Sequence, residues 1–151
     1  MISAATVLGG EKELGQVIRR TVDFDVLIRK GIPVSVISHI KKELHLADEV
    51  IARIVGISPR TVARRRKKEA RHAGASGVDR LSPVESDRIY RFARIVALAE
   101  DIFEGRDEAL EWLNSPQNGL GGAVPLSMLQ TDAGTREVEE LLTRIDYGVI
   151  S

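Results

Sequence analysis

The sequence of 151 residues contains no cysteine. Disulfide bonds and thiolate metal sites are therefore excluded, and a reducing cytoplasm is the natural compartment for such a chain. Long apolar runs are also missing, since no stretch is long enough to cross a bilayer as a helix. The chain does not begin with a charged-then-apolar leader and a cleavage site, so we expect no secretion signal and no membrane partner.

The chain also has no net charge, because 22 Lys and Arg balance 22 Asp and Glu. The two signs are unevenly placed along it. Residues 1–80 hold 16 Lys and Arg against 9 Asp and Glu, whereas residues 81–151 hold 6 against 13. A cationic half suits nucleic acid, and an anionic half would be repelled by it. The asymmetry therefore predicts two modules with two different partners.

Groups that could carry catalysis or hold a metal are scarce. The chain has three histidines, and none of them fits a metal-ligand pattern. The carboxylates of Glu137, Glu139 and Glu140 are more typical of a solvated helix face than of a general acid–base pair. We therefore expect no enzyme activity, no metal and no cofactor.

What the sequence does contain is a pattern of two short helices joined by a tight turn in residues 46–69. Gly56 can adopt the turn conformation that other residues resist. Ser58 and Pro59 suit the N-cap and the first position of the second helix. That helix directs Val62 inward and a row of cations outward. This layout is typical of a helix-turn-helix whose second helix enters the DNA major groove.

The second helix carries five consecutive cations, from Arg64 to Lys68. It could be an ordinary solvated helix of a bundle, but its like charges would then repel one another, whereas a polyanion relieves that repulsion. We predict base or near-base contacts from Arg60, Thr61, Arg64 and Arg65. The other predicted DNA-binding residues are Ser58, Arg66, Lys67, Lys68 and Arg71. Because one helix-turn-helix reads only a half-site, we also expect a homodimer.

The sequence predicts an all-α protein with four segments. Residues 1–22 form an N-terminal segment that we expect to be flexible, with a frayed start over residues 1–10 and either a short helix or a strand over residues 11–20. Residues 23–71 form the helix-turn-helix domain. Residues 72–80, which are rich in Gly and other small residues, form a hinge. Residues 81–151 form a second, small helical domain.

The second domain begins with a strong helix signal. Ser82, Pro83 and Glu85 suit the N-cap, N1 and N3 positions of a capping box, and a long helix with one apolar face follows. A short helix, a Gly-rich loop and a last helix capped by Thr131 complete the domain. The apolar residues after this last helix either return to the core or dock on another protein.

Together the two halves resemble the Xre/MbcA/ParS antitoxins, over roughly residues 23–151. In the second half the resemblance rests on LSPVESDR, on the turn from Trp112 to Pro116 and on the closing Tyr147-Gly148. In the first half it rests on SPRTVARR. It implies an antitoxin that is not itself an enzyme and that pairs with a RES-domain toxin, which depletes NAD⁺. The C-terminal domain would cover the toxin's active-site cleft.

By this resemblance the last helix, the tail and the Gly-rich loop would contact the toxin. The expected contacts are Leu120, Leu126, Leu129, Arg136, Glu140, Arg144, Tyr147, Val149, Ile150 and Ser151. The basic half would bind operator DNA and repress the toxin–antitoxin operon, as a homodimer within a hetero-oligomeric complex. The alternative is a stand-alone helix-turn-helix transcriptional regulator whose C-terminal half is a dimerisation or effector domain.

Overall fold

The computed structural model describes residues 3–71 and 78–148 of the chain. The all-α prediction is confirmed, since these residues form helices joined by turns, with one isolated backbone bridge and no strand. In chain order the helices are α1 (Ala4–Val7), α2 (Gly10–Leu14), α3 (Thr21–Lys30), α4 (Ser35–Leu44), α5 (Asp48–Val55), α6 (Pro59–Arg71), α7 (Pro83–Phe103), α8 (Arg106–Leu113), the 3₁₀ turns η1 (Asn118–Leu120) and η2 (Pro125–Met128), and α9 (Asp132–Asp146).

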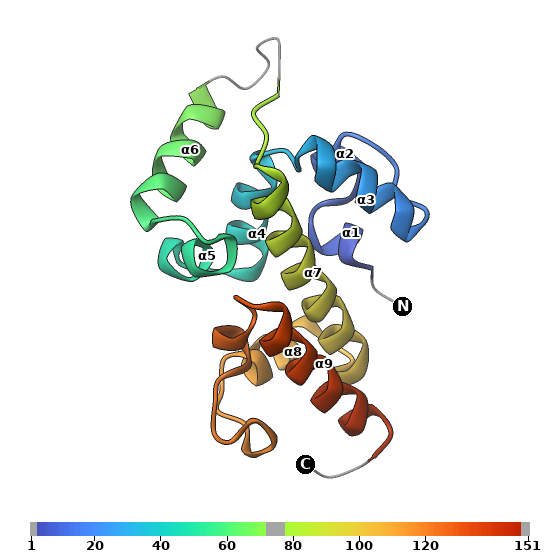
Figure 1. Ribbon diagram of the computed structural model, residues 1–151. Coiled ribbons are helices and arrows are strands. Elements are labelled where there is room, and N and C mark those ends of the chain that lie inside the picture. The colour runs from blue at the N-terminus through green and yellow to red at the C-terminus, as the bar shows by residue number, and fades with distance from the viewer. Residues whose placement is uncertain (1–2, 72–77, 149–151) are drawn as a thin grey trace.

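The long helix α7 is the axis of the fold. Figure 1 shows it descending through the molecule, with α1 to α6 around its upper part and α8 and α9 beside its lower part. It packs against α1, α3 and α5 from the first half of the chain and against α8 and α9 from the second. Buried side chains from both halves, such as Leu27 and Leu142, belong to one hydrophobic cluster that includes Phe92 of α7. The two predicted domains therefore share a core.

The start of α7 follows from the sequence. The Ser82 hydroxyl accepts a hydrogen bond from the Glu85 N–H at 3.1 Å, and the Glu85 carboxylate accepts one from the Ser82 N–H at 2.8 Å. This reciprocal pair is the predicted capping box, and it satisfies donors that a helix start otherwise leaves free. The carboxylate of Glu85 is thereby held in one place at the first turn.

The expectation of a frayed start is wrong from residue 4 onward, and the helix at residues 10–14 is one of the two alternatives that the sequence left open there. Residues 4–14 form α1 and α2, and Val7, Leu8 and Leu14 are fully buried. Helix α1 packs directly on α7. Helices of four and five residues are too short to show an apolar period in the sequence, and their stability comes from packing.

The structure describes only the end of the predicted hinge at residues 72–80. Its residues before Val78 lie outside the described part of the chain. After them, the Val34 N–H donates to the Asp79 carbonyl at 2.9 Å, and the Arg80 guanidinium donates to a backbone carbonyl in the turn before α4. The end of this segment is therefore attached to the helix-turn-helix half.

The helix-turn-helix itself forms as predicted. Gly56 ends α5 with a φ of 84°, in the left-handed region, and α6 begins at Pro59. The Ser58 hydroxyl accepts the Thr61 N–H at 3.1 Å and so caps α6. Val62 is fully buried against the core. The local signals for the turn, the cap and the inward side chain thus agree with the tertiary structure.

Gly56→Ala is expected to lower the free energy of unfolding by about 1–2 kcal/mol, because alanine is strained at this positive φ. A Cβ at this position would also overlap the Arg88 guanidinium, whose Nη1 donates to the Val55 carbonyl at 3.3 Å. Urea denaturation followed by circular dichroism measures the change. Gly122→Ala is the matched control, since Gly122 has a φ of 88° and open space around its Cα. Equal decreases in the free energy of unfolding of the two variants would show that displacing Arg88 does not destabilise the fold.

Candidate functional sites

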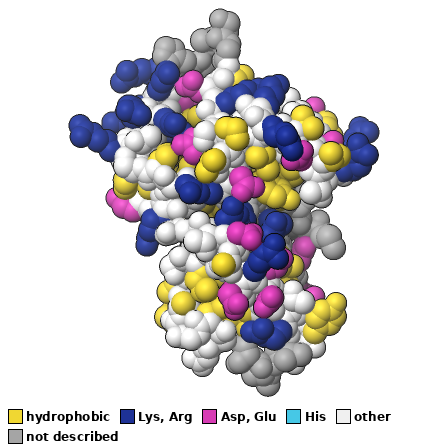
Figure 2. Space-filling view, viewed as in Figure 1, with side chains coloured by type: hydrophobic (Ala, Val, Ile, Leu, Met, Phe, Trp, Pro, Cys, Tyr) yellow, Lys and Arg dark blue, Asp and Glu magenta, His cyan; other side chains and the backbone are white. Residues whose placement is uncertain are grey.

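One face of α6 is a continuous cationic surface. Its charged residues lie three or four positions apart along the helix, so they fall on the same side. Figure 2 shows Lys and Arg side chains gathered at the upper left, where Figure 1 places α6. With two small residues they line an open groove: Arg60, Thr61, Ala63, Arg64, Lys67, Lys68 and Arg71. We call these seven residues the α6 groove.

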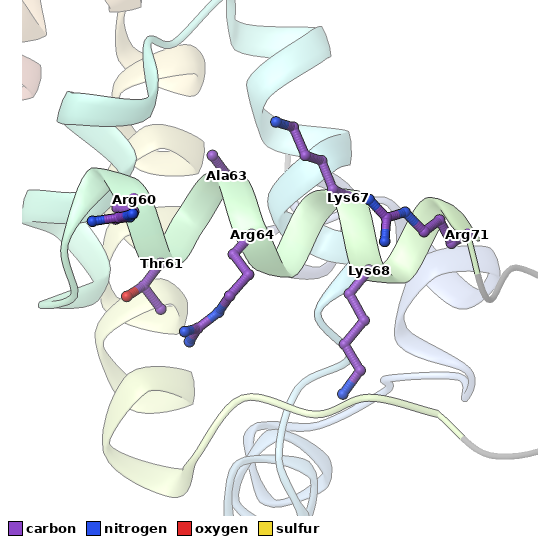
Figure 3. A pocket seen from close by; sticks show the side chains of 7 residues that line it. All are labelled: Arg60, Thr61, Ala63, Arg64, Lys67, Lys68 and Arg71. Carbon is purple, nitrogen blue, oxygen red and sulfur yellow. The ribbon is translucent and has the colours of Figure 1, made fainter.

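The side chains of the α6 groove project to both sides of the helix. Figure 3 shows Thr61, Arg64 and Lys68 projecting to one side of the helix, and Ala63 and Lys67 to the other. All five cations of the groove are exposed. The structure thus brings together six of the nine residues predicted to bind DNA. A row of exposed guanidinium and ammonium groups on one helix face can neutralise a row of phosphates.

The remaining three predicted residues lie elsewhere. Ser58 is occupied as the cap of α6, and its hydroxyl also lies 2.9 Å from the Thr61 hydroxyl. Arg65 donates from Nη1 to Glu85 Oε1 at 3.0 Å, and Arg66 donates from Nη2 to Asp48 Oδ2 at 2.9 Å. Both arginines are half-buried and face other helices of the same chain.

The two carboxylates that bind these arginines have lowered pKa values. Burial raises the pKa of the Glu85 carboxyl, but hydrogen bonds from the Ser82 N–H and from Arg65 outweigh it and hold the pKa below its ordinary value. Burial likewise raises the pKa of Asp48, and the hydrogen bond from Arg66 together with the ion pair with Lys41 reverses the shift. Both groups are therefore ionised in the folded protein at neutral pH.

We expect the contribution of Glu85 to stability to disappear in acid. A carboxyl whose pKa is lower in the folded than in the unfolded state stabilises the fold above its unfolded value, here near 4.5, and loses that effect as the pH falls through the folded pKa. The free energy of unfolding should therefore fall between about pH 5 and about pH 3, and less steeply in Glu85→Gln than in the wild type. Urea denaturation at a series of pH values measures both slopes. If the free energy of unfolding depends on pH equally steeply in both proteins, Glu85 does not make this contribution to stability.

The second half of the chain presents α9 and the loops before it. Its start forms as predicted, with the Gly134 N–H donating to the Thr131 hydroxyl at 3.0 Å. Val138, Leu141 and Leu142 are buried and hold α9 against α7 and the preceding turns. The other face of α9 is polar and open to solvent.

The residues predicted to contact a toxin fall into three groups. Tyr147 is 81% exposed just after α9, and Arg136 and Glu140 are exposed on α9 itself. Partly buried are Leu120, Leu126 and Arg144. Val149, Ile150 and Ser151 lie outside the described residues.

Leu129 is a correction to the predicted contact set. Its side chain is 1% exposed and belongs to the hydrophobic core, so it cannot touch a partner on this surface. A leucine in a loop gives no sequence signal of which way its side chain points, because the loop has no regular period. Leu129 anchors the turn before α9 instead.

Sequence reasoning did not identify a second groove, between the start of α7 and the start of α9. It is lined by Pro83, Val84, Asp87, Arg88, Arg91, Gln130, Thr131 and Asp132. Its walls are far apart along the chain, so no local motif could predict it. No group of three or more His, Asp or Glu suited to a metal ion occurs in the described part of the chain.

The fold defines a helix-turn-helix protein with a second helical unit built on the lower part of α7. Residues 23–94 match the antitoxin Xre-like helix-turn-helix domain, and residues 98–148 match the antitoxin Xre/MbcA/ParS C-terminal toxin-binding domain. The chain belongs to the Xre/MbcA/ParS family of antitoxins. The two matches meet inside α7, beyond the predicted hinge, which agrees with the role of α7 as an axis shared by both halves.

The chain is similar to individual proteins over most of its length. It is 34% identical over 128 residues to "Antitoxin Xre" of Photorhabdus laumondii, covering 84% of this chain and 80% of that protein. It is 28% identical over 139 residues to a "Prs ADP-ribosylating antitoxin" of Sphingobium sp., covering 86% and 82%. In fold it is similar to a chain of the crystal structure of the M. tuberculosis MbcT–MbcA toxin–antitoxin complex, with a TM-score of 0.53, 24% identity and coverage of 78% and 96%.

These findings confirm the predicted family and with it an antitoxin whose partner is a toxin. Within the residues that the structure describes, no helix combines the length and the apolarity that crossing a bilayer requires.

Proposed function

We propose that this antitoxin neutralises a RES-domain toxin that degrades NAD⁺ and represses its own operon by binding operator DNA. The observation that carries the proposal is the placement of two unlike surfaces along α7. The α6 groove is cationic and lies beside its upper part, whereas α8 and α9 form an acidic lobe beside its lower part. One chain can therefore hold DNA at one end and a protein at the other. We propose that it does so in the cytoplasm and catalyses no reaction itself.

The DNA-binding half of the proposal rests on α6. Its exposed cations, from Arg60 to Arg71, follow one face over about 16 Å of helix, at 1.5 Å per residue. A helix of this diameter and charge fits the DNA major groove, and the phosphates on either side suit Lys67 and Lys68. Because one such helix reads a half-site, we propose a homodimer on a near-palindromic operator.

The toxin-binding half rests on the charge and the exposed groups of the C-terminal lobe. Residues 98–148 contain 11 Asp and Glu against 3 Arg and no Lys. A cleft that binds the diphosphate of NAD⁺ has to be basic, so an acidic lobe with a few apolar anchors complements it. We propose that the lobe covers this cleft with Tyr147 as its aromatic anchor. The further proposed contacts are Leu120, Leu126, Arg136, Glu140 and Arg144.

A second candidate for the toxin's reaction is the ADP-ribosylation of a protein. The name of the Sphingobium relative, which is similar over most of this chain, favours it. Both reactions consume NAD⁺, so both would require a basic cleft and would be blocked by the same acidic lobe. They differ in where the ADP-ribose moiety goes.

The test is co-expression of this chain with the protein encoded beside its gene. We expect the two to co-purify and cellular NAD⁺ to be maintained, while the neighbour alone depletes it. Both reactions free nicotinamide, so mass spectrometry of small molecules and of proteins separates them by the ADP-ribose moiety. NAD⁺ degradation leaves that moiety in solution, whereas ADP-ribosylation leaves it on a protein. A neighbour that neither binds the chain nor consumes NAD⁺ would exclude both versions.

A further inference from the structure

We infer that Arg65 and Arg66 are positioning residues that hold α6 at a set rotation, and that they do not contact DNA. The inference rests on the proposed DNA binding by α6. In the sequence these two arginines are part of one unbroken run of cations. In the structure they lie on the opposite side of α6 from the α6 groove and bind carboxylates of neighbouring helices.

The inward face of α6 is unusual because most of it is charged. Among the thirteen residues of α6, all of which the structure describes, Val62 is the one that is fully buried. The positions that follow it on the same face, three, four and seven residues on, are Arg65, Arg66 and Glu69, and all three are half-buried. An ordinary core-facing helix has apolar residues there. Beyond its first turn, α6 is therefore held by charged contacts.

The first contact joins α6 to α7. Arg65 Nη1 lies 3.0 Å from Glu85 Oε1, and the two side chains are 30% and 13% exposed. The same Oε1 accepts the Ser82 N–H of the capping box, so it is already fixed before Arg65 reaches it. A preorganised, half-buried partner makes an ion pair stronger than the exposed pairs of a protein surface.

The second contact joins α6 to α5 and α4. Arg66 Nη2 lies 2.9 Å from Oδ2 of Asp48, the first residue of α5, and Lys41 Nζ of α4 lies 3.2 Å from the other oxygen. Arg65 and Arg66 are adjacent, so they leave the helix about 100° apart. Two contacts at this angle, to α7 and to α5, oppose rotation of α6 in either direction.

The rotation of α6 decides where the groove cations point. Rotating the helix would turn Arg64 away from the base edge that it is proposed to read, while the flexible lysine side chains still reach phosphates and the number of cations stays the same. Loss of either contact should therefore weaken binding to the operator. It should not reduce the number of counterions released, which is what the salt dependence of affinity reports.

Substitution of Glu85 distinguishes a positioning role from a purely electrostatic one, because the two predict opposite changes in operator affinity. Removing a negative charge near DNA should strengthen binding if electrostatics alone operates. We expect Glu85→Gln to weaken binding to the operator roughly tenfold, because Arg65 then faces a neutral amide and loses its ion pair. Asp87→Asn is the matched control: it removes the same charge from α7, where Asp87 pairs with Arg91 at 2.7 Å. That variant should bind as tightly as the wild type or more tightly.

The experiment is a double-mutant cycle with Arg65→Gln, Glu85→Gln and the pair, in which operator affinity is measured by fluorescence anisotropy at several salt concentrations. We expect the double variant to bind no more weakly than either single variant, and the slope of affinity against salt to stay that of the wild type. Two results together would overturn the inference: a salt slope lowered by about one unit in Arg65→Gln, and an operator affinity of Glu85→Gln equal to that of Asp87→Asn. Wild-type protein with no salt-dependent binding would instead refute the proposed DNA function.

Asp48→Asn supplies an independent arm should Glu85→Gln fold poorly, which circular dichroism will show. It removes the negative charge that pairs with Arg66 and leaves the capping box of α7 intact. We expect the same weakening with the same salt slope. Unchanged or tighter binding by a folded Asp48→Asn would equally contradict the positioning role.

Discussion

A chain that ends at Asp146 is expected to lose its ability to neutralise the toxin. The truncation removes Tyr147, which is 81% exposed, and the apolar residues after it, and it leaves all of α9 in place. Aromatic anchors at interfaces commonly contribute 2 kcal/mol or more, so we expect inhibition to weaken about 30-fold or more. The measurement is the rate of NAD⁺ consumption by the toxin as antitoxin is titrated in.

The truncated chain should remain folded, because Leu141 and Leu142 still hold α9 against the core. Its circular dichroism and its thermal midpoint therefore serve as the control for folding. Val26→Ser, at an exposed apolar position on α3, is the matched surface control and should inhibit normally. Full neutralisation by the truncated chain would rule out the proposed role of this end as a plug.

Arg64→Ala is expected to cost about 1–3 kcal/mol on the operator and to blunt the preference for operator over unrelated DNA. Arg64 is exposed and projects into the α6 groove beside Thr61, where it can reach a base edge (Figure 3). The measurement is affinity for operator and for scrambled DNA at one salt concentration. The ratio of the two affinities should fall in the variant.

Lys67→Ala is the companion measurement, because Lys67 lies on the other edge of the groove and is proposed to bind a phosphate (Figure 3). It should weaken both DNAs alike and lower the salt slope by about one unit. If the two variants behave in the same way, the division of the groove into base-reading and phosphate-binding residues is wrong, although DNA binding itself would stand.

Features that depend on a few neighbouring residues were predictable. The turn at Gly56, the cap at Ser58, the capping box before α7 and the cap at Thr131 each form within four residues of chain. Their hydrogen bonds and backbone angles are local, so residue type and spacing are sufficient to specify them. The antitoxin family was recognisable for the same reason, since its motifs lie in these turns and loops.

Features that depend on distant neighbours were not predictable. Helix α1 exists because Val7 and Leu8 are buried against α7, which is far away in the chain. Leu129 appeared to be a surface contact because nothing in its loop indicates that it points into the core. Glu100, an acidic residue near the C-terminal end of α7, is 2% exposed and is bound by Arg106 at 2.9 Å.

By itself the sequence determined an all-α chain with a basic helix-turn-helix and an acidic second half, because charge, periodicity and capping are properties of short stretches. Its resemblance to a family of antitoxins rested on the motifs in its turns and loops. Only the tertiary structure divided the five consecutive cations of α6 into those that face solvent and those that bind Glu85 and Asp48. A guanidinium has the same chemistry in either place. Its role depends on whether a carboxylate from another helix lies within hydrogen-bonding distance, and that is decided by packing.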